Sequence, residues 1–316
     1  MNRKIPFTKM VGTGNDFIVV DALRHPLGAF KRRWRPISRA LCDRHAGIGA
    51  DGVLLLEPSD SANVKMRVFN PDGSEAEMCG NGARCVALYL KAQRWAGDRV
   101  TIETRAGGVE ATVRGPSARF GMSPSRGRMG CCGRVAMRLM DPTALRPKLQ
   151  VKAGGRTFRA GFIDTGVPHL VVPVKGLDGL DVVSLGRALR HHRAFAPRGA
   201  NVNFIQADPS QSNRLRVRTY ERGVEDETLA CGTGLVASAV LYALSRYQNA
   251  GRSSSGTNGH RHHHWTIDVV PRSSDLLRVS FSIVPQGPAL RIVNVVMEGE
   301  AVRVFDGTVD WPPRRT

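Results

Sequence analysis

The sequence predicts two domains of similar structure, produced by an internal duplication and each combining several strands with one apolar helix. The 316 residues are long for one domain and comfortable for two of roughly equal size. An apolar content of 41% supports packed cores in both. Equivalent motifs recur at a nearly constant offset, as three pairs show: Gly14 and Gly166 are 152 residues apart, Asp51 and Asn201 are 150, and Cys79 and Cys231 are 152 (231 − 79). An offset held over half the chain indicates a duplication.

In the first half, apolar runs rich in β-branched residues follow glycine-containing loops, as strands that leave a turn do. We expect strands over residues 17–22, 53–56, 65–69, 100–104 and 109–113. The segment from Ala83 to Ala92 carries apolar side chains at helical spacing, and Cys79-Gly80-Asn81-Gly82 stands directly before it. Cys79 is therefore predicted to lie at a helix N-terminus.

The second half repeats this order. We expect strands over residues 158–164, 170–174, 214–220, 265–270, 277–283 and 293–304, a loop and strand over 200–205, and a helix over 180–191. An apolar helix over 235–244 follows Cys231-Gly232-Thr233-Gly234, so Cys231 is predicted at a second helix N-terminus. Two segments lack apolar periodicity: residues 117–147 indicate a crossing between domains with an insertion, and residues 249–264 a flexible surface excursion.

Composition disfavours several other classes of protein. No stretch approaches the ~18 apolar residues of a membrane helix and the N-terminus has no apolar signal region, so we expect a soluble, cytoplasmic protein with no membrane partner. Six cysteines without paired Cys-x-x-Cys motifs argue against a disulfide scaffold and against structural zinc. His260 and His262 to His264 fit a solvated loop better than a metal site, and we predict no metal.

The formal net charge of +19 and the pI near 10.7 are unusual. A basic surface can attract nucleic acid, but the arginines are scattered through every segment, and no zinc-finger, RNP-like or helix-turn-helix pattern is present. We therefore do not expect nucleic acid as a partner. A non-catalytic basic protein that binds nucleic acid stays open as an alternative, which salt-sensitive retention on DNA would support.

Two cysteines at helix N-termini suit the inversion of a stereocentre. Proton transfer needs a base on one face of the carbon and an acid on the other, and a helix N-terminus favours the thiolate. Because duplicated domains commonly meet across a pseudo-two-fold axis, we expect Cys79 opposite Cys231, with two separate sites as the alternative. The backbone N–H groups of Gly80-Asn81 and Gly232-Thr233 are expected to bind a carboxylate and the developing charge. Acidic stretches before each cysteine oppose thiolate formation, so the resting protonation of both thiols stays open.

Longer motifs surround both cysteines. The first half carries Lys9-Met10 through Gly14-Asn15-Asp16-Phe17, Arg44-His45-x-Gly47-x-Gly49-x-Asp51-Gly52 and Phe69-Asn70-x-Asp72-Gly73-Ser74-x-x-x-Met78-Cys79-Gly80-Asn81-Gly82-Ala83-Arg84-Cys85. The second half carries Gly166-x-Pro168-His169, Asn201-x-Asn203-Phe204, Tyr220-Glu221-Arg222-Gly223 and Glu227-Thr228 to Ala230-Cys231-Gly232-Thr233-Gly234. Taken together, these motifs are highly specific, and over most of its length the chain resembles the diaminopimelate epimerase family.

The resemblance implies an α+β fold of two pseudo-symmetric domains, each a curled, mostly antiparallel sheet around a central helix, with the last strand returning to the first domain. The N-terminal domain would comprise residues 1–116 plus 302–316, and the C-terminal domain residues 117–301. The resemblance also implies interconversion of LL- and meso-diaminopimelate, a small-molecule amino-acid substrate, without pyridoxal phosphate or another cofactor, for lysine and peptidoglycan precursors. Nothing in the sequence fixes the oligomeric state, and a homodimer stays open.

By matching position, Cys79 and Cys231 are the expected acid and base. The expected substrate ligands are Asn15, Asn70, Gly80, Asn81, Asn201, Glu221, Arg222, Gly232 and Thr233, of which Gly80, Asn81, Gly232 and Thr233 would hold the reacting carboxylate. His169 either orients a catalytic group or only ends a strand. Cys42, Cys85, Cys131 and Cys132 are expected to be structural or incidental.

The sequence departs from the family pattern at Val167 and Gly52, where some members carry Asn and Gln, so both positions lose side-chain contacts. A proline or hydroxyproline racemase-like enzyme is the nearest alternative within enzymes. The polar set Asn70, Asn201 and Arg222 favours a substrate with two polar ends over a cyclic imino acid.

Overall fold

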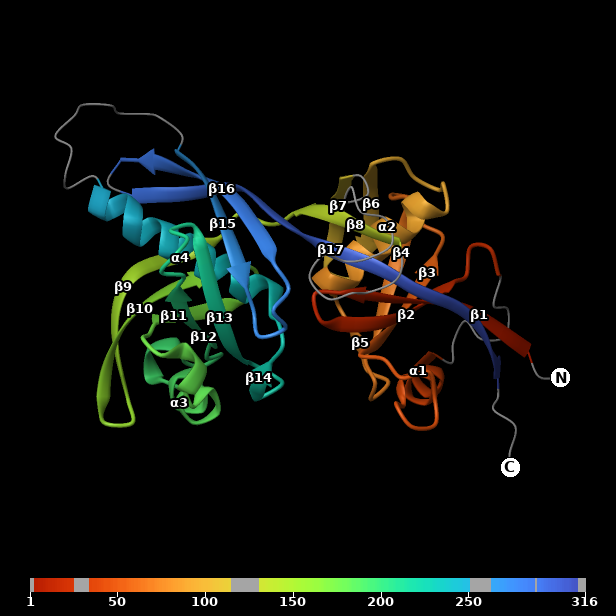
Figure 1. Cartoon of the computed structure of the whole chain (residues 1–316), viewed down its shortest axis with the longest axis horizontal. Helices are drawn as coiled ribbons and strands as arrows, with labels where there is room; N and C mark the ends of the chain where they lie inside the picture. The colour runs from red at the N-terminus through yellow and green to blue at the C-terminus, as the bar shows by residue number, and fades with distance from the viewer. Residues whose placement is uncertain (1–2, 26–33, 115–130, 251–262, 288, 312–316) are drawn as a thin grey trace. The chain divides into compact units, whose positions relative to one another are not determined.

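The computed structural model of the chain describes residues 3–25, 34–114, 131–287 and 289–311. These fall into two compact units (Figure 1): unit 1 comprises Met1–Met137 with Glu298–Thr316, and unit 2 comprises Arg138–Met297. The boundary expected between residues 116 and 117 lies outside the described residues, as does most of the excursion expected at 249–264. No helix within the described ranges is long and apolar enough to cross a membrane.

In unit 1 the paired strands form a closed series, in which the last strand pairs with the first. The strands are β1 (Arg3–Gly12), β2 (Asn15–Asp21), β3 (Gly52–Glu57), β4 (Val64–Phe69), β5 (Glu75–Ala76), β6 (Arg99–Thr104), β7 (Gly107–Arg114), β8 (Cys131–Arg138) and the last part of β17 (Ala289–Trp311). β1 pairs with β2, β2 with β3, β3 with β4, β4 with β6, β6 with β7 and β7 with β8, and β17 pairs with both β8 and β1. Of the pairs with a described register, β2–β3 and β4–β6 are parallel and the others antiparallel.

Unit 2 repeats this pattern of pairing. Its strands are β9 (Thr143–Ala153), β10 (Arg156–Asp164), β11 (Pro168–Pro173), β12 (Asn201–Ala207), β13 (Arg214–Glu221), β14 (Asp226–Thr228), β15 (His263–Val270), β16 (Leu277–Gln286) and the first part of β17. β10–β11, β12–β13 and β15–β16 are antiparallel, and β11–β12 and β13–β15 are parallel. The same order of antiparallel and parallel pairs runs from β1 to β7, and β5 and β14 are the equivalent short strands. The two units are therefore two copies of one topology, as the duplication predicts.

Each sheet surrounds one helix. In unit 1, α2 (Gly80–Ala92) contacts β1, β2, β4, β6 and β7, and its residues 81–90 are all buried. In unit 2, α4 (Gly232–Ala250) contacts β9 to β13, β15 and β16, and its apolar residues 235–244 join one core with the surrounding strands. A helix that is apolar on all sides is stable only when it is covered on all sides. The predicted α+β fold of curled, mostly antiparallel sheets around central helices is confirmed.

The outer face of each sheet is covered by a second helix. α1 (Trp34–Cys42) packs Trp34, Ile37 and Leu41 into a core with β2 and β3. α3 (Val182–Arg190), flanked by the short 3₁₀ turns η2 (Leu177–Gly179) and η3 (Arg193–Phe195), covers β12 and β13. The long β17 begins in unit 2 and ends in unit 1, as the returning last strand requires.

Several elements differ from the sequence expectations. Strands β1 and β9 and helix α1 were not predicted. The segment 117–147, expected to be a crossing between domains with an insertion, contains β8 and the start of β9, which were not predicted, while its residues 117–130 lie outside the described part. His263 and His264, expected in a loop, begin β15.

Candidate active site

Cys79 occupies the N-cap of α2. Its backbone is extended (φ −139°, ψ 113°), and its Sγ accepts a hydrogen bond from the backbone N of Gly82 at 3.4 Å. The thiol is half-buried. By their position, the N–H groups of Gly80 and Asn81 in the first turn have no carbonyl partner within the helix, so they are suited to an anion. The sequence prediction that Cys79 lies at a helix N-terminus is confirmed.

The side chain of Asn81 connects α2 to the turn between β1 and β2. Its Nδ2 donates to Oδ1 of Asn15 at 2.6 Å, and its Oδ1 accepts from Nη2 of Arg84 at 2.6 Å. Arg84 is fully buried and also donates to Oγ1 of Thr13 at 2.5 Å. Gly12 allows this close packing, because a Cβ there would lie 2.8 Å from the backbone oxygen of Asn81. Cys79, Asn81, Asn15 and Arg84 are called the Cys79 cluster below.

An ion-pair network anchors the Asn15 turn from the other side. Asn15 Nδ2 donates to Oδ2 of Asp51 at 3.0 Å, and Arg44 bridges Asp51 and Asp16 with two contacts of 2.7 Å. Asp16 also pairs with the buried Lys9 at 2.7 Å. Burial disfavours the charged form of Asp16, but the hydrogen bonds and charges of Arg44 and Lys9 outweigh it and lower its pKa to about 2. The network keeps Asn15 in place against α2.

Asn70 follows β4 and lies in a tight turn. Its Nδ2 donates to Oγ of Ser74 at 2.9 Å, and its backbone N donates to the Ser74 carbonyl at 2.8 Å. Both hydrogen bonds are local to the turn. Asn70 therefore has a structural role whatever else it binds, and its role as a substrate ligand stays a prediction.

Cys231 directly precedes α4 and faces the side chain of Thr233. The backbone O of Cys231 accepts from Leu235 N at 2.9 Å, which is the first hydrogen bond of the helix. Its Sγ lies 3.6 Å from Oγ1 of Thr233, which in turn lies 3.0 Å from Nε2 of His169. Nδ1 of His169 lies 3.1 Å from Nδ2 of Asn203. Cys231, Thr233, His169 and Asn203 are called the Cys231 cluster below.

His169 is fully buried and uncharged. It lies on β11 beside β12, which carries Asn203, so the sheet brings together two side chains that are 34 residues apart. Burial, and to a smaller extent the charge of Arg222, lower the pKa of His169 to about 3. The imidazole is therefore neutral throughout the physiological pH range.

The Cys231 thiol is protonated at neutral pH. Burial and, after it, the charge of Glu221 raise its pKa to about 12, against the opposing hydrogen bonds of Thr233 and Gly234. Glu221 itself has a raised pKa because it is buried, although Thr228 Oγ1 donates to it at 2.8 Å. An acidic neighbour thus works against the thiolate in unit 2.

Asn201 binds main-chain groups with both ends of its amide. Nδ2 donates to the carbonyl of Pro168 at 3.1 Å, and Oδ1 accepts from the backbone N of Arg222 at 2.8 Å. The residue is buried. Asn201 thereby fixes the backbone that carries Arg222, and contacts of either residue with a substrate stay predictions.

The other cysteines whose side chains are described are buried. Cys85 is fully buried one turn into α2, and burial raises its pKa to about 12. Burial likewise raises the pKa of Cys42 to about 11. None of the cysteines whose side chains are described, Cys42, Cys79, Cys85, Cys132 and Cys231, is in a disulfide. Within the described residues, no three His, Cys, Asp or Glu side chains gather as a metal site requires.

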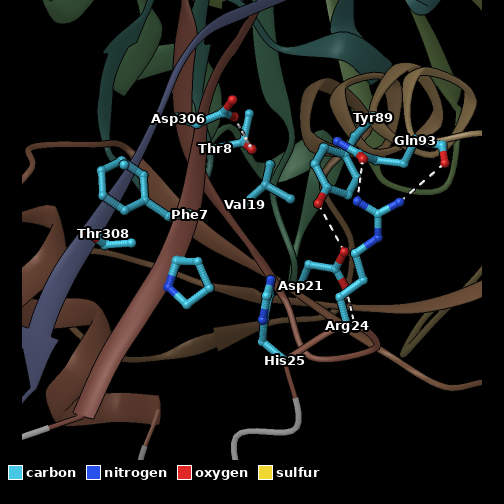
Figure 2. A pocket seen from close by; sticks show the side chains of 12 residues that line it. Phe7, Thr8, Val19, Asp21, Arg24, His25, Tyr89, Gln93, Asp306 and Thr308 are labelled. Atoms are coloured by element: carbon cyan, nitrogen blue, oxygen red, sulfur yellow. Dashed lines mark hydrogen bonds between the residues drawn. The ribbon is translucent and has the colours of Figure 1, made fainter.

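A pocket of about 430 Å³ in unit 1 lies at the other end of α2 from Cys79. Figure 2 shows Tyr89 and Gln93, near the C-terminal end of the helix, facing Asp21 and Arg24. Tyr89 donates to Oδ2 of the buried Asp21 at 2.9 Å, and Arg24 donates to Oε1 of Gln93 at 2.6 Å. Since α2 has 13 residues, its two ends are separated by about 20 Å. This pocket is therefore separate from the Cys79 cluster.

Several supporting residues had no role assigned from the sequence, among them Asn203, Thr13, Asp51 and Arg84. Asn203 offered the clearest signal, because it is a polar residue within the apolar strand β12 and lies two positions after Asn201, on the same face of the strand. Arg84 stands among apolar residues of a helix that is buried on all sides. Buried polar side chains of this kind need partners, and those partners indicate what the side chain positions.

The fold is shared with several solved structures. A hydroxyproline epimerase from Agrobacterium vitis superposes with a TM-score of 0.61 at 16% identity, covering 99% of this chain and 94% of that one. A methylitaconate-delta-isomerase gives 0.61 at 15% identity, with 98% and 96% covered. A PhzF-family phenazine biosynthesis protein from Bacillus anthracis gives 0.58 at 17%, with 97% and 99% covered. These likenesses extend over nearly the whole of each chain, so the chain has the fold of these structures.

Sequence comparison gives the family within that fold. The diaminopimelate epimerase family profile matches residues 7–126 and 161–268. The chain is 36% identical to a diaminopimelate epimerase of Aquifex aeolicus over 308 residues, which covers 95% of this chain and 96% of that protein. It is 40% identical to one of Pelotomaculum thermopropionicum over 321 residues, with 98% and 99% covered. The chain belongs to the diaminopimelate epimerase family and is an isomerase.

Proposed function

We propose that this protein interconverts LL- and meso-diaminopimelate by removing the α-proton with one of the two cysteines, Cys79 or Cys231, and adding a proton from the other. The observation that carries the proposal is the matched construction of the two clusters: in both units a cysteine precedes a Gly-x-Gly turn that opens the central helix. The near full-length similarity to diaminopimelate epimerases gives the substrate. The two thiols act on opposite faces of the same α-carbon.

The protonation of Cys231 sets the direction of the first transfer. Because its pKa is raised to about 12, Cys231 begins as the acid, and the base is then the thiolate of Cys79. Cys79 takes the α-hydrogen as a proton, and the electron pair of the broken bond stays on the α-carbon and its carboxylate. The Cys231 thiol then gives its proton to the opposite face. The turnover ends with Cys79 as the thiol and Cys231 as the thiolate.

The helix N-termini supply the electrostatic part of the mechanism. The reacting carboxylate accepts hydrogen bonds from the N–H groups of Gly80 and Asn81 and of Gly232 and Thr233, which stabilise the charge as it develops. This arrangement takes the role that an electron-withdrawing cofactor fills elsewhere, so we propose a reaction without cofactor or metal. Glu221, Arg222 and Asn70 bind the distal ammonium and carboxylate, for which a bidentate guanidinium is well suited.

We further propose that the product serves lysine and peptidoglycan precursor synthesis and that the protein acts in the cytoplasm. Growth of a bacterial strain that lacks its own diaminopimelate epimerase, restored by this chain but not by Cys79→Ser, would support that role. Failure of an active protein to restore growth would contradict it. A homodimer stays a prediction, and sedimentation velocity tests it by measuring the oligomeric state.

Exchange of the α-hydrogen with deuterated solvent tests the proposed reaction. The reduced protein, incubated with LL-diaminopimelate in D₂O, should lose the substrate α-proton signal and form meso-diaminopimelate with one deuteron per inversion. Cys79→Ser and Cys231→Ser should each slow inversion by about 10²–10⁴-fold, since a serine hydroxyl is a far weaker acid than a thiol and does not form the anionic base near neutral pH. Cys42→Ala, a buried cysteine outside both clusters, is the matched control and should retain the rate.

Two results would overturn the assignment. Exchange with proline or hydroxyproline but none with diaminopimelate would indicate a racemase of cyclic imino acids. No exchange with either substrate, together with salt-sensitive retention on DNA, would favour a nucleic-acid-binding protein.

A further inference from the structure

The side-chain amide of Asn203 fixes which groups donate and which accept in the hydrogen bonds of the Cys231 cluster. Its Nδ2 lies 3.1 Å from the carbonyl O of Leu170, and a carbonyl accepts but does not donate. Its Oδ1 accepts from Oγ1 of Thr219 at 2.9 Å, which is consistent with the same orientation of the amide. The second hydrogen of Nδ2 is therefore directed at Nδ1 of His169, 3.1 Å away.

This orientation determines the tautomer of His169. Because Nδ1 accepts a hydrogen bond from Asn203, the single proton of the neutral ring is on Nε2. Nε2 then donates to Oγ1 of Thr233 at 3.0 Å. Since the Thr233 oxygen accepts from His169, its own proton is directed away from the ring, and Sγ of Cys231 lies 3.6 Å from that oxygen.

We infer that Asn203 is a positioning residue of the proposed reaction: by holding the His169 proton on Nε2, it makes the Thr233 hydroxyl a donor to the Cys231 thiolate. The inference rests on the proposed function, in which Cys231 gains a negative charge in every turnover. When Cys231 is a thiol, the Thr233 oxygen is able to accept from it. When Cys231 is a thiolate, the Thr233 hydroxyl rotates to donate. His169 takes up no proton in either state and acts only as a fixed donor.

The surroundings of His169 support a neutral, fixed ring. The residue is fully buried on β11, and Arg222 adds a positive charge that disfavours the imidazolium. Gly234, one residue after Thr233, leaves room for the Asn203 amide, because a Cβ at this position would lie 2.3 Å from Asn203 Oδ1. Gly234 thus makes room for the Asn203 amide in addition to forming part of the Gly-x-Gly turn that opens α4.

The tautomer is measured directly by ¹⁵N NMR of the full chain labelled at histidine, without substrate. The wild-type spectrum should show His169 protonated on Nε2 and unprotonated on Nδ1 from pH 8 to pH 5, with His169→Gln assigning the signal among the nine histidines. In Asn203→Asp, the carboxylate accepts where the amide donated, so Nδ1 should become protonated. A wild-type ring protonated on Nδ1, or an unchanged ring in Asn203→Asp, would overturn the inference.

The effect on the thiolate is measured by the alkylation rate of Cys231 across pH, resolved by peptide mass spectrometry, with Cys79 in the same sample as reference. Thr233→Val keeps the shape but removes the hydroxyl, and it should slow Cys231 alkylation about tenfold at fixed pH, because a charge-assisted hydrogen bond to the thiolate is lost. Thr233→Ser should restore the rate.

The matched control is Thr165→Val. Thr165 Oγ1 donates to the backbone O of Thr233 at 3.1 Å. Thr165 is not one of the four residues in the hydrogen-bond series from Asn203 through His169 and Thr233 to Cys231, so Cys231 alkylation should stay at the wild-type rate. Equal rates in the wild type and Thr233→Val would contradict the inference. Because neither measurement uses substrate, both outcomes are independent of whether diaminopimelate is epimerised.

Discussion

The side-chain amide of Asn81 donates to the amide oxygen of Asn15 at 2.6 Å, which ties the N-terminus of α2 to the β1–β2 turn. This hydrogen bond joins two residues 66 positions apart and fixes the β1–β2 turn against the helix end at which Cys79 lies. The same amide accepts from the fully buried Arg84. Asn81 is thus a junction of two buried polar contacts as well as a proposed substrate ligand.

Asn81→Leu should lower both stability and activity. The substitution removes the oxygen to which Arg84 donates and the donor to Asn15, and the loss of such buried contacts costs about 2–3 kcal/mol. Urea unfolding followed by circular dichroism measures this cost as a lower midpoint. Asn70→Ala is the comparison, because the hydrogen bonds of Asn70 within the described residues are made inside its own turn, to Ser74 and Gly73. It should cost less than about 1 kcal/mol in stability while reducing deuterium exchange. Equal urea midpoints for the two variants would contradict this account.

Alkylation should distinguish Cys79 from the buried cysteines of unit 1. Cys79 is half-buried at a helix N-cap, whereas burial raises the pKa of Cys85 to about 12 and that of Cys42 to about 11. Iodoacetamide at pH 8 should therefore modify Cys79 at least about tenfold faster than either of the others. Peptide mass spectrometry over time gives the three rates in one sample. Comparable rates would show that helix placement and exposure do not single out Cys79.

Stability should fall as the pH is lowered through the range in which unfolded histidine takes up a proton. The folded chain keeps His169 neutral to about pH 3, while the unfolded chain protonates it below about 6.5. The stabilisation is fully present above pH 6.5 and is lost as the pH falls toward 3, by about 2 kcal/mol at pH 5. Urea unfolding at pH 7 and pH 5 measures it. His169→Gln should show a smaller loss between the two values, and an identical loss would argue against a buried neutral ring.

Gly234→Ala should destabilise the protein although alanine favours helices. A Cβ at Gly234 would lie 2.3 Å from Asn203 Oδ1, so the Asn203 amide would have to move, at a cost of about 1–3 kcal/mol. Gly232→Ala is the matched control in the same turn, because its nearest contact is the flexible end of Met297 at 3.3 Å. The thermal midpoint should fall for Gly234→Ala and change little for Gly232→Ala. The reverse order would refute the packing argument.

The central part of each unit was predictable because its signals are local. Glycine-containing loops followed by β-branched runs predicted β2, β3 and β11, and the apolar runs after the two cysteines predicted α2 and α4. Elements outside this pattern were missed for physical reasons. Lys9 interrupts the apolar pattern of β1, yet it is buried because it pairs with Asp16. β9 is mostly exposed and so carries little apolar alternation.

The site was predictable in its residue types but not in its hydrogen bonding. The motifs indicated His169 and Thr233, but the contact of His169 with Asn203 depends on the register between β11 and β12. Likewise, no local pattern relates Asn81 to Asn15. Helix α1 could have been predicted from the spacing of its apolar residues, because Trp34, Ile37 and Leu41 lie at helical intervals and are all buried. Arginines and a proline between them obscured this pattern.

The length of β17 has a consequence for the order in which the protein is completed. Gly12 at the end of β1 pairs with Ala301, so the ribosome makes nearly all of the chain between the two partners. At a translation rate of about 5–20 residues per second, the pairing partner of β1 is synthesised on the order of 15–60 s after β1 itself. Unit 1, although its first strand is translated first, is therefore completed only when the end of β17 is made, and early termination near the 3′ end of the message would damage the domain encoded at its 5′ end.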